Sequence, residues 1–168
     1  NEKLDIYYKG KLVLSDYETA RKKSEKNPYE DLAIAELEGH TVGKDEEKTD
    51  AVTIIKKLGK DDAIYGLGDK PGCLNKRGYS YVNWNTDDPA PHVDSFKSLY
   101  KSIPFFIVLG DEYCYGIFAD NTYKTTFDFG YENTDYYFVE HEKGELDYYF
   151  MPGNDMAEVV GLYTSLNL

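Results

Sequence analysis

The sequence has 168 residues, of which 41% are hydrophobic and 30% charged, so it can form one domain with its own core. Its formal net charge of −12 repels nucleic-acid phosphates and anionic lipids. No apolar run approaches the ~20 residues that a membrane helix needs. These features argue against a nucleic-acid or membrane partner and fit a neutral one.

The residues that usually bind metals are too scattered to predict a metal or cofactor site. Cys73 and Cys114 match no zinc spacing and no disulfide framework, and His40, His92 and His141 form no i, i+4 pair. The sequence also contains no Asn-x-Ser/Thr glycosylation site. We therefore expect no cofactor, and a reducing, cytoplasmic location.

The N-terminal part predicts a hairpin followed by a segment without a clear pattern. Leu4–Tyr8 and Lys11–Asp16 are short β-like runs around the turn residues Lys9-Gly10. Such a hairpin needs a sheet to join. Between residues 18 and 50 only Asp31–Glu38 has an apolar rhythm, which fits either a strand or a short helix.

From residue 52 onward the pattern predicts strands in close succession. An aromatic content of 15% suits pleated sheet surfaces. Short turns rich in Gly, Asp and Asn separate most strands, without helices between them, which favours an all-β antiparallel sandwich of two sheets. The predicted strands are Val52–Leu58, Ala63–Leu67, Tyr79–Trp84, Ile103–Leu109, Glu112–Asp120, Lys124–Gly130, Asp135–Glu140 and Glu145–Phe150.

Two glycines at the end of the second of these strands predict a special backbone rather than a nucleotide-binding loop. Gly66 and Gly68 are followed by Pro71 and by no amphipathic helix, whereas a dinucleotide fold needs one. We expect a turn with positive φ that lets two backbones approach closely.

The chain ends with one predicted helix. Asn154 or Asp155 can cap it, and Glu158 stands in capping-box register with Asp155. The apolar residues of this helix recur at i, i+3, i+4 and i+7, which predicts one packing face. They are Met156, Val159, Val160 and Tyr163.

A long connection leads from Tyr79–Trp84 to Ile103–Leu109, and the run at its start contains several residues that can contact a ligand. Trp84, Asn85, Thr86 and two adjacent aspartates precede Pro89 in the sequence WNTDDP. A long loop inside a compact domain is usually functional or disordered. The aromatic residues Tyr65, Tyr79, Tyr81 and Trp84 lie in the surrounding stretch Ile64–Phe106 and favour an ordered, functional segment.

Four runs of the sequence together match one known pattern, namely YGLGDKPGCLNKRGYSYVNWNTDDPAP, LYKSIPFFI, YGIFADNTYKTTFDFG and MPGNDMAEVVGLYTSL. They resemble the N-terminal β-sandwich domain of glycoside hydrolase family 31, the α-glucosidases, α-xylosidases and relatives. The resemblance is dense from about Ile64 to the end of the chain and thin before Val52. It implies a galactose-mutarotase-like sandwich over residues 1–153 and a helix over residues 154–168 that leads towards a catalytic barrel.

The resemblance also implies where catalysis takes place. Family members carry the nucleophile and the acid/base aspartate on the barrel, in motifs such as W-x-D-M-N-E, and this sequence contains no such block. A retaining glycosidase needs two carboxyl groups ~5 Å apart, whereas Asp87 and Asp88 are neighbours that an extended chain would point in opposite directions. We therefore expect no catalytic residue in this chain and no activity from it alone.

The resemblance implies that residues of this loop contact the substrate. In the family an aspartate of this loop contacts the sugar beyond the scissile bond, and that role falls on Asp87, with Asn85 and Thr86 as neighbours. Trp84 could stack on a sugar. The alternatives are that Asp87 or Asp88 caps a turn and that Trp84 belongs to the core.

The expected function is therefore that of a non-catalytic domain of an α-glucosidase-type enzyme that acts on α-linked oligosaccharides. Its partners would be the sugar substrate and the barrel of the same chain, and a fragment without the barrel would self-associate. A free-standing carbohydrate-binding module and a purely structural domain remain alternatives, because sandwiches host many functions.

Overall fold

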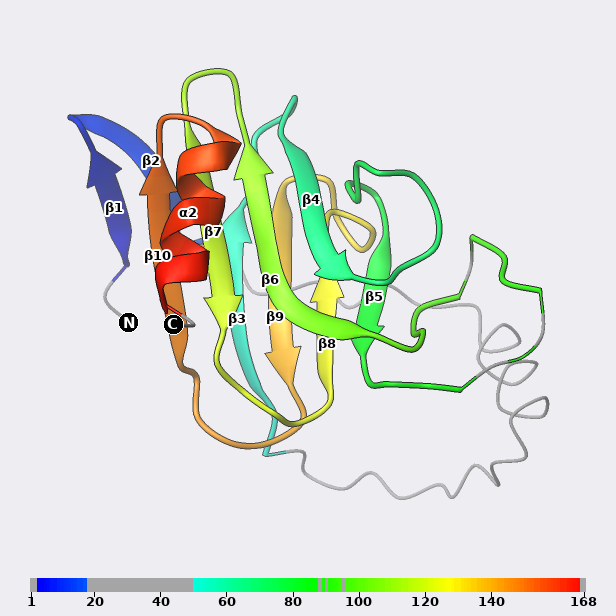
Figure 1. Ribbon diagram of the computed structural model, residues 1–168. Coiled ribbons are helices and arrows are strands. Elements are labelled where there is room, and N and C mark those ends of the chain that lie inside the picture. Colours follow the sequence, from blue (N-terminus) through cyan, green and yellow to red (C-terminus); the bar gives the residue numbers. More distant parts are fainter. Residues whose placement is uncertain (1–2, 18–49, 88, 90, 95, 167–168) are drawn as a thin grey trace.

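The computed structural model describes residues 3–17, 50–87, 89, 91–94 and 96–166, and it forms a two-sheet sandwich with a helix outside (Figure 1). All strand pairs among these described residues are antiparallel, as the sequence predicts. The elements are β1 Asp5–Tyr8, β2 Lys11–Ser15, β3 Val52–Lys57, β4 Ala63–Gly68, β5 Ser80–Asn83, β6 Ser102–Leu109, β7 Cys114–Ala119, β8 Thr125–Asp128, β9 Tyr136–His141, β10 Tyr148–Gly153 and α2 Met156–Leu166.

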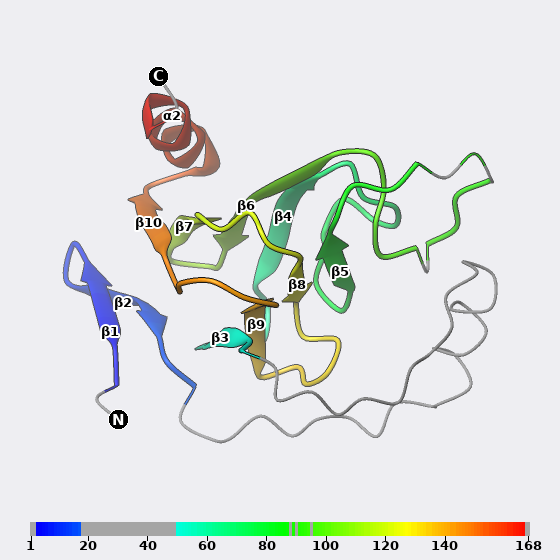
Figure 2. The same cartoon turned by 90° about the horizontal axis from the view of Figure 1, so that it is seen from below.

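The strands form two four-stranded sheets and one hairpin. One sheet has the order β10-β7-β6-β4 and the other β3-β9-β8-β5. Seen from below, the layers are α2, the β10-β7-β6-β4 sheet and the β3-β9-β8-β5 sheet (Figure 2). The predicted all-β sandwich is confirmed, whereas the predicted segment Asp31–Glu38 lies outside the described residues.

The central strands are apolar on both faces because both faces are covered. In β6, Phe106 and Val108 point into the space between the sheets, and Phe105 and Ile107 point towards α2. This placement follows from the two-residue period of a strand. A strand covered on both sides loses the alternation of polar and apolar residues.

The predicted hairpin closes one side of the sandwich. Lys9 and Gly10 both have positive φ, 50° and 80°, as a two-residue hairpin turn requires. In β2, Val13 and Leu14 are buried in the core between the sheets. Asp16, next to the end of β2, pairs with Lys56 of β3, and the buried Lys56 forms an ion pair with it.

The glycines of β4 have the predicted positive φ and close approach. Gly66 has φ +130°, and a Cβ on it would lie 2.5 Å from the Phe105 carbonyl oxygen. The pairing of β4 with β6 shifts register between Gly66 and Gly68. Leu67 between them has φ 69° and is fully buried. The bulge thus brings the end of β4 against β6.

The last strand and the helix depart from the sequence prediction in two places. The strand β10 continues through Pro152 to Gly153, which an edge strand tolerates. In α2, Val159 is buried against the sheet and Tyr163 stacks on Phe105 with ring centroids 4.0 Å apart. The other two members of the predicted packing face are instead exposed, Met156 by 39% and Val160 by 45%.

The start of α2 is capped as predicted. The Asp155 carboxylate accepts a hydrogen bond from the Glu158 amide at 2.9 Å, and the Glu158 carboxylate accepts one from the Asn154 amide at 2.8 Å. These bonds satisfy donors that a helix start leaves free.

Candidate functional site

The loop of residues 84–101 connects β5 to β6 and extends on the side of the molecule opposite the β1–β2 hairpin (Figures 1 and 2). Its two limbs run side by side, because the amide of Val82 donates to the Lys97 carbonyl at 2.8 Å and that of Thr86 to the Leu99 carbonyl at 3.0 Å. Leu99 is 4% exposed and anchors the returning limb. The start of the loop is therefore an ordered extension of β5.

Three side-chain hydrogen bonds lie at the carbonyl of Trp84, and two of them, those of Ser98, join the limbs. The Ser98 hydroxyl donates to this carbonyl oxygen. The Thr86 hydroxyl lies 3.2 Å from the Ser98 hydroxyl and 3.1 Å from the same carbonyl oxygen. Thr86 is half-buried, so its hydroxyl serves the loop rather than solvent.

The other predicted site residues are exposed on the same segment. Trp84 is 55% exposed, and Asn85 and Asp87 are exposed as well. Among the described residues, none donates a hydrogen bond to the Asp87 carboxylate. The chain therefore brings the four predicted residues together on one short segment. Asp88 lies outside the described residues.

A buried lysine contacts the strand β5, which leads into this segment. The Lys70 ammonium group donates to the Val82 carbonyl at 3.2 Å, and Lys70 is only 9% exposed. This burial lowers the pKa of Lys70 to about 8, because the charged form loses its hydration. Lys76 in turn donates to the carbonyls of Lys70 and Pro71, at 3.3 and 3.1 Å.

The sequence prediction missed Lys70 and Ser98. Lysine is normally a surface residue, so nothing in its sequence position indicated burial. Ser98 lies 14 residues after Trp84, and only the folded loop brings the two together. A sequence signal for either residue is lacking.

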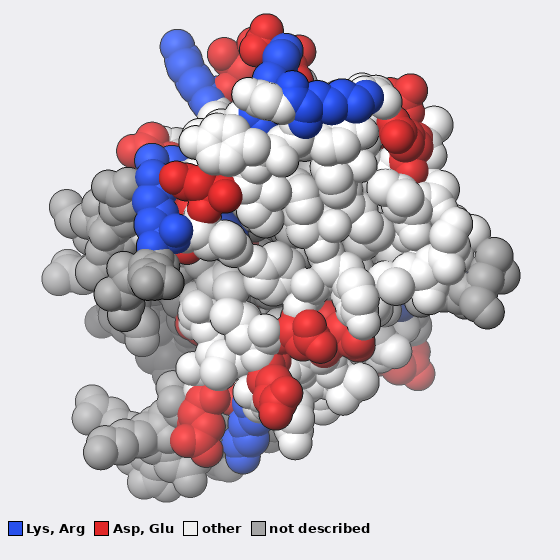
Figure 3. Space-filling view, turned by 90° about the vertical axis from the view of Figure 1, so that its left-hand side faces the viewer, with Lys and Arg blue, Asp and Glu red and all other residues white. Residues whose placement is uncertain are grey.

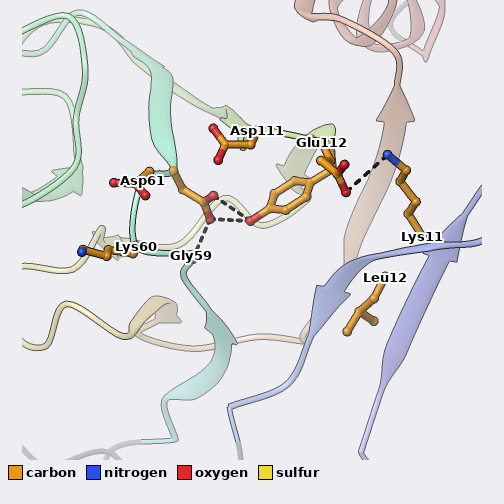
Figure 4. Close-up of a pocket in the computed structure, with 9 residues that line it drawn as sticks. Lys11, Leu12, Gly59, Lys60, Asp61, Asp111 and Glu112 are labelled. Carbon is orange, nitrogen blue, oxygen red and sulfur yellow. Dashed lines mark hydrogen bonds and ion pairs between the residues drawn. The ribbon is translucent and has the colours of Figure 1, made fainter.

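Apart from this loop, the structure has a cleft of about 430 Å³ among β2, the β3–β4 turn and the β6–β7 turn (Figure 4). Several acidic residues line it, but the buried Asp62 carboxylate is occupied. It accepts hydrogen bonds from the Tyr113 hydroxyl at 2.6 and 2.8 Å and from the Gly59 amide at 2.7 Å. Burial and this carboxylate raise the pKa of Tyr113 well above its usual value. Asp62 thus has a structural role.

Two further classes of site find no support in the described part of the chain. Its His, Cys, Asp and Glu side chains nowhere gather in a group of three or more that could hold a metal ion. Its one helix is too short to cross a membrane.

Comparison with known proteins places these features in a family. The glycosyl hydrolase 31 N-terminal galactose mutarotase-like domain matches residues 2–128. An α-glucosidase of Bacillus thermoamyloliquefaciens is 44% identical over 115 residues, which cover 68% of this chain and 14% of that enzyme. The α-xylosidase XylQ of Lactiplantibacillus pentosus is 34% identical over 109 residues, which cover 65% of this chain and 13% of that enzyme.

A solved structure is similar over almost the whole chain. It is a glycoside hydrolase family 31 dextranase of Flavobacterium johnsoniae in complex with isomaltotriose. The sequence identity is 38% and the TM-score 0.72, and the match covers 97% of this chain and 17% of that one. The chain therefore spans a minor part of each of these enzymes.

Proposed function

The chain belongs to the glycoside hydrolase family 31 N-terminal galactose mutarotase-like domains, and we propose that it is the non-catalytic domain of an α-glucosidase-type enzyme. In this proposal the sandwich packs against the catalytic barrel of the same polypeptide. The loop of residues 84–101 reaches the substrate and contacts the sugar on the leaving-group side of the scissile bond.

The chemistry of the described residues supports a non-catalytic role. Retaining glycosidases hydrolyse with two carboxyl groups ~5 Å apart, one of them protonated. The one buried carboxylate of the acidic cleft, that of Asp62, is held by Tyr113 and Gly59 instead. The relatives are several times longer than the matched region, which leaves room for a catalytic domain in them.

The placement of Asp87 supports the substrate contact most directly. Its carboxylate is exposed and receives no hydrogen bond from any described residue, whereas Thr86 beside it is tied to Ser98. An ordered backbone thus presents a free acceptor. A carboxylate accepts hydrogen bonds from sugar hydroxyls, and charge assistance makes such bonds stronger than neutral ones. The exposed Trp84 adds a flat apolar surface on which a sugar ring can stack.

The relatives support an α-linked oligosaccharide as the substrate class. The two enzymes named above are an α-glucosidase and an α-xylosidase, and the dextranase structure contains isomaltotriose. We propose an α-glucosidic oligosaccharide for the enzyme that carries this domain.

The face formed by α2 and β10 supports packing against the barrel. A groove of about 450 Å³ lies between Tyr8 of the hairpin, Tyr149 of β10 and Leu162 and Leu166 of α2. On this side the surface shows a broad area without charged side chains, bordered by charged groups (Figure 3). Apart from Glu158, the groove is lined by apolar and aromatic side chains, and exposed apolar areas mark interaction sites. The catalytic barrel is the occupant that we propose.

The test uses two proteins, the purified 168-residue chain and the longer enzyme that we propose carries this domain. Hydrolysis of an aryl α-glucoside and of α-linked disaccharides is measured with each. We expect turnover from the longer enzyme alone. Turnover by the purified 168-residue chain would contradict the proposal.

A further inference from the structure

The Ser98 side chain connects the two limbs of the 84–101 loop. A serine hydroxyl has one proton to donate and two lone pairs that accept. The proton goes to the carbonyl oxygen of Trp84, and a lone pair accepts from Thr86 at 3.2 Å. Thr86 and Ser98 thus form a short chain of hydrogen bonds that ends on the backbone of Trp84.

We propose that Ser98 is a positioning residue that fixes the Trp84–Asp87 segment for substrate binding. This inference rests on the proposed function and goes beyond it, because it assigns the orientation of the loop to a residue outside the substrate-contacting segment. Ser98 stands on the returning limb, is half-buried and directs its hydroxyl towards the opposite limb.

The direction of Asp87 depends on the backbone before it. No described residue holds its carboxylate, so the position of this group follows from the chain between Trp84 and Asp87. Among the described residues, two bonds from the returning limb hold that chain, the Thr86 amide on the Leu99 carbonyl at 3.0 Å and the Ser98 hydroxyl on the Trp84 carbonyl. Without the Ser98 hydroxyl, the described contacts leave the Trp84 carbonyl bonded to the Thr86 hydroxyl of its own limb, at 3.1 Å, and the returning limb no longer holds this carbonyl. A preorganised loop binds more tightly because less conformational entropy is lost on binding.

The kinetic test uses the longer enzyme and compares kcat/KM on an α-linked disaccharide with kcat/KM on an aryl α-glycoside. Ser98→Ala removes the donor, whereas Ser98→Thr keeps a hydroxyl at the same place. We expect the ratio of disaccharide to aryl activity to fall about threefold to tenfold in Ser98→Ala, the effect of one hydrogen bond. It should recover in Ser98→Thr. Ser165→Ala, at the end of α2, is the matched control and should leave the ratio unchanged.

A double-mutant cycle with Asp87→Ala separates this inference from the proposed function. If Ser98 acts through Asp87, the double variant should show the ratio of Asp87→Ala alone. A fall in Asp87→Ala without one in Ser98→Ala would overturn the positioning role and leave the proposed function standing. A fall in Ser98→Ala alone would contradict the role of Asp87 and support positioning of Trp84.

A second readout does not depend on activity, because Trp84 is the one tryptophan of the sequence. We expect its fluorescence anisotropy to fall and its quenching by acrylamide to rise in Ser98→Ala of the 168-residue chain, with the melting temperature nearly unchanged. If the anisotropy of Ser98→Ala equals that of the wild type, the positioning role of Ser98 is overturned. This result holds whatever the kinetic variants show, because it does not depend on enzyme activity.

Discussion

Val159 of α2 lies directly over Gly116 of β7. A Cβ on Gly116 would be 2.7 Å from the Val159 Cγ1 and 2.7 Å from the Phe105 Cε2, closer than side-chain atoms approach. Gly153 at the end of β10 faces the same valine, since its Cβ would lie 2.7 Å from the Val159 Cγ2. The absence of two side chains from the sheet therefore lets the helix rest on it.

Gly116→Ala should destabilise the domain by about 1–3 kcal/mol, because the added methyl group must displace α2 or Phe105. Urea unfolding followed by circular dichroism measures this free energy. Gly161→Ala is the control, since Gly161 lies within α2 and a Cβ there meets no atom within 4 Å. It should stabilise the domain by up to about 1 kcal/mol through helix propensity. Equal effects of the two variants would contradict the close packing of α2.

The exposed face of α2 should make the 168-residue chain self-associate at high concentration. Val160, Leu162 and Leu166 are 45%, 42% and 42% exposed, and they remain uncovered when the chain is alone. Val160→Lys should weaken association in sedimentation experiments and lower the binding of an apolar dye. Leu74→Lys, which changes a leucine that is 80% exposed in another loop, is the control. A strictly monomeric wild-type chain without dye binding would contradict this prediction.

Lys70 should make the free energy of unfolding depend on pH. Its pKa is about 8 in the folded chain, below the ordinary value of 10.5. Between these values the unfolded state binds more protons, so the contribution of Lys70 to stability rises with pH. Below pH 8, Lys70 is charged in both states, and burial of the charge lowers the free energy of unfolding by at most about 3 kcal/mol.

Lys70→Met removes this titration. The variant should gain most stability relative to wild type below pH 8, and the gain should shrink as the pH approaches 10. Denaturant unfolding at several pH values measures the free energy of unfolding of the variant minus that of the wild type. Titrations of groups that both proteins share cancel in this difference. Lys60→Met, at an exposed position, is the control. A gain that is the same at pH 7 and pH 10 would show that burial does not lower the pKa of Lys70.

The strands were predictable because their signals are local. Alternating or continuous apolar runs and the turn at Lys9-Gly10 depend on neighbouring residues, so the hairpin and the two sheets agree with the prediction. The close approach at Gly66 was predictable for the same reason, since glycine is the residue that accepts positive φ without strain.

The helix face was predicted only in part. The spacing of Met156, Val159, Val160 and Tyr163 marks a broad apolar stripe, but the sheet covers the narrower part around Val159 and Tyr163. Which part is covered depends on the contact with β6 and β7, which a helical period does not contain.

The sequence predicted which segment contains the candidate site, but it did not predict the hydrogen bonds that hold this segment. The WNTDDP run and its family resemblance indicated residues 84–87. The hydrogen bond from Ser98 to Trp84 depends on how the loop closes, and the burial of Lys70 depends on the packing of another loop. The roles of Trp84, Asn85, Thr86 and Asp87 towards substrate and the domain boundary at residue 153 stay predictions.

Asp87→Ala in the longer enzyme that we propose carries this domain tests whether Asp87 binds the substrate. If the carboxylate accepts hydrogen bonds from the leaving-group sugar, the variant loses a charge-assisted bond worth roughly 1.5–3 kcal/mol, so kcat/KM on a maltose-type disaccharide should fall about tenfold to a hundredfold. An aryl glycoside lacks those hydroxyls and should be affected much less. Asp94→Ala, an exposed carboxylate of the same loop, is the matched control.

The decisive measurement is therefore the ratio of kcat/KM on the disaccharide to kcat/KM on the aryl glycoside, with melting temperatures recorded for each variant. We expect this ratio to fall at least tenfold in Asp87→Ala and to stay at the wild-type value in Asp94→Ala, with the melting temperature preserved. If Asp87 only holds a turn, the loop loosens, stability drops by about 1 kcal/mol and both substrates lose activity alike. Equal losses on the two substrates, or no loss on either, would show that Asp87 does not bind the leaving-group sugar.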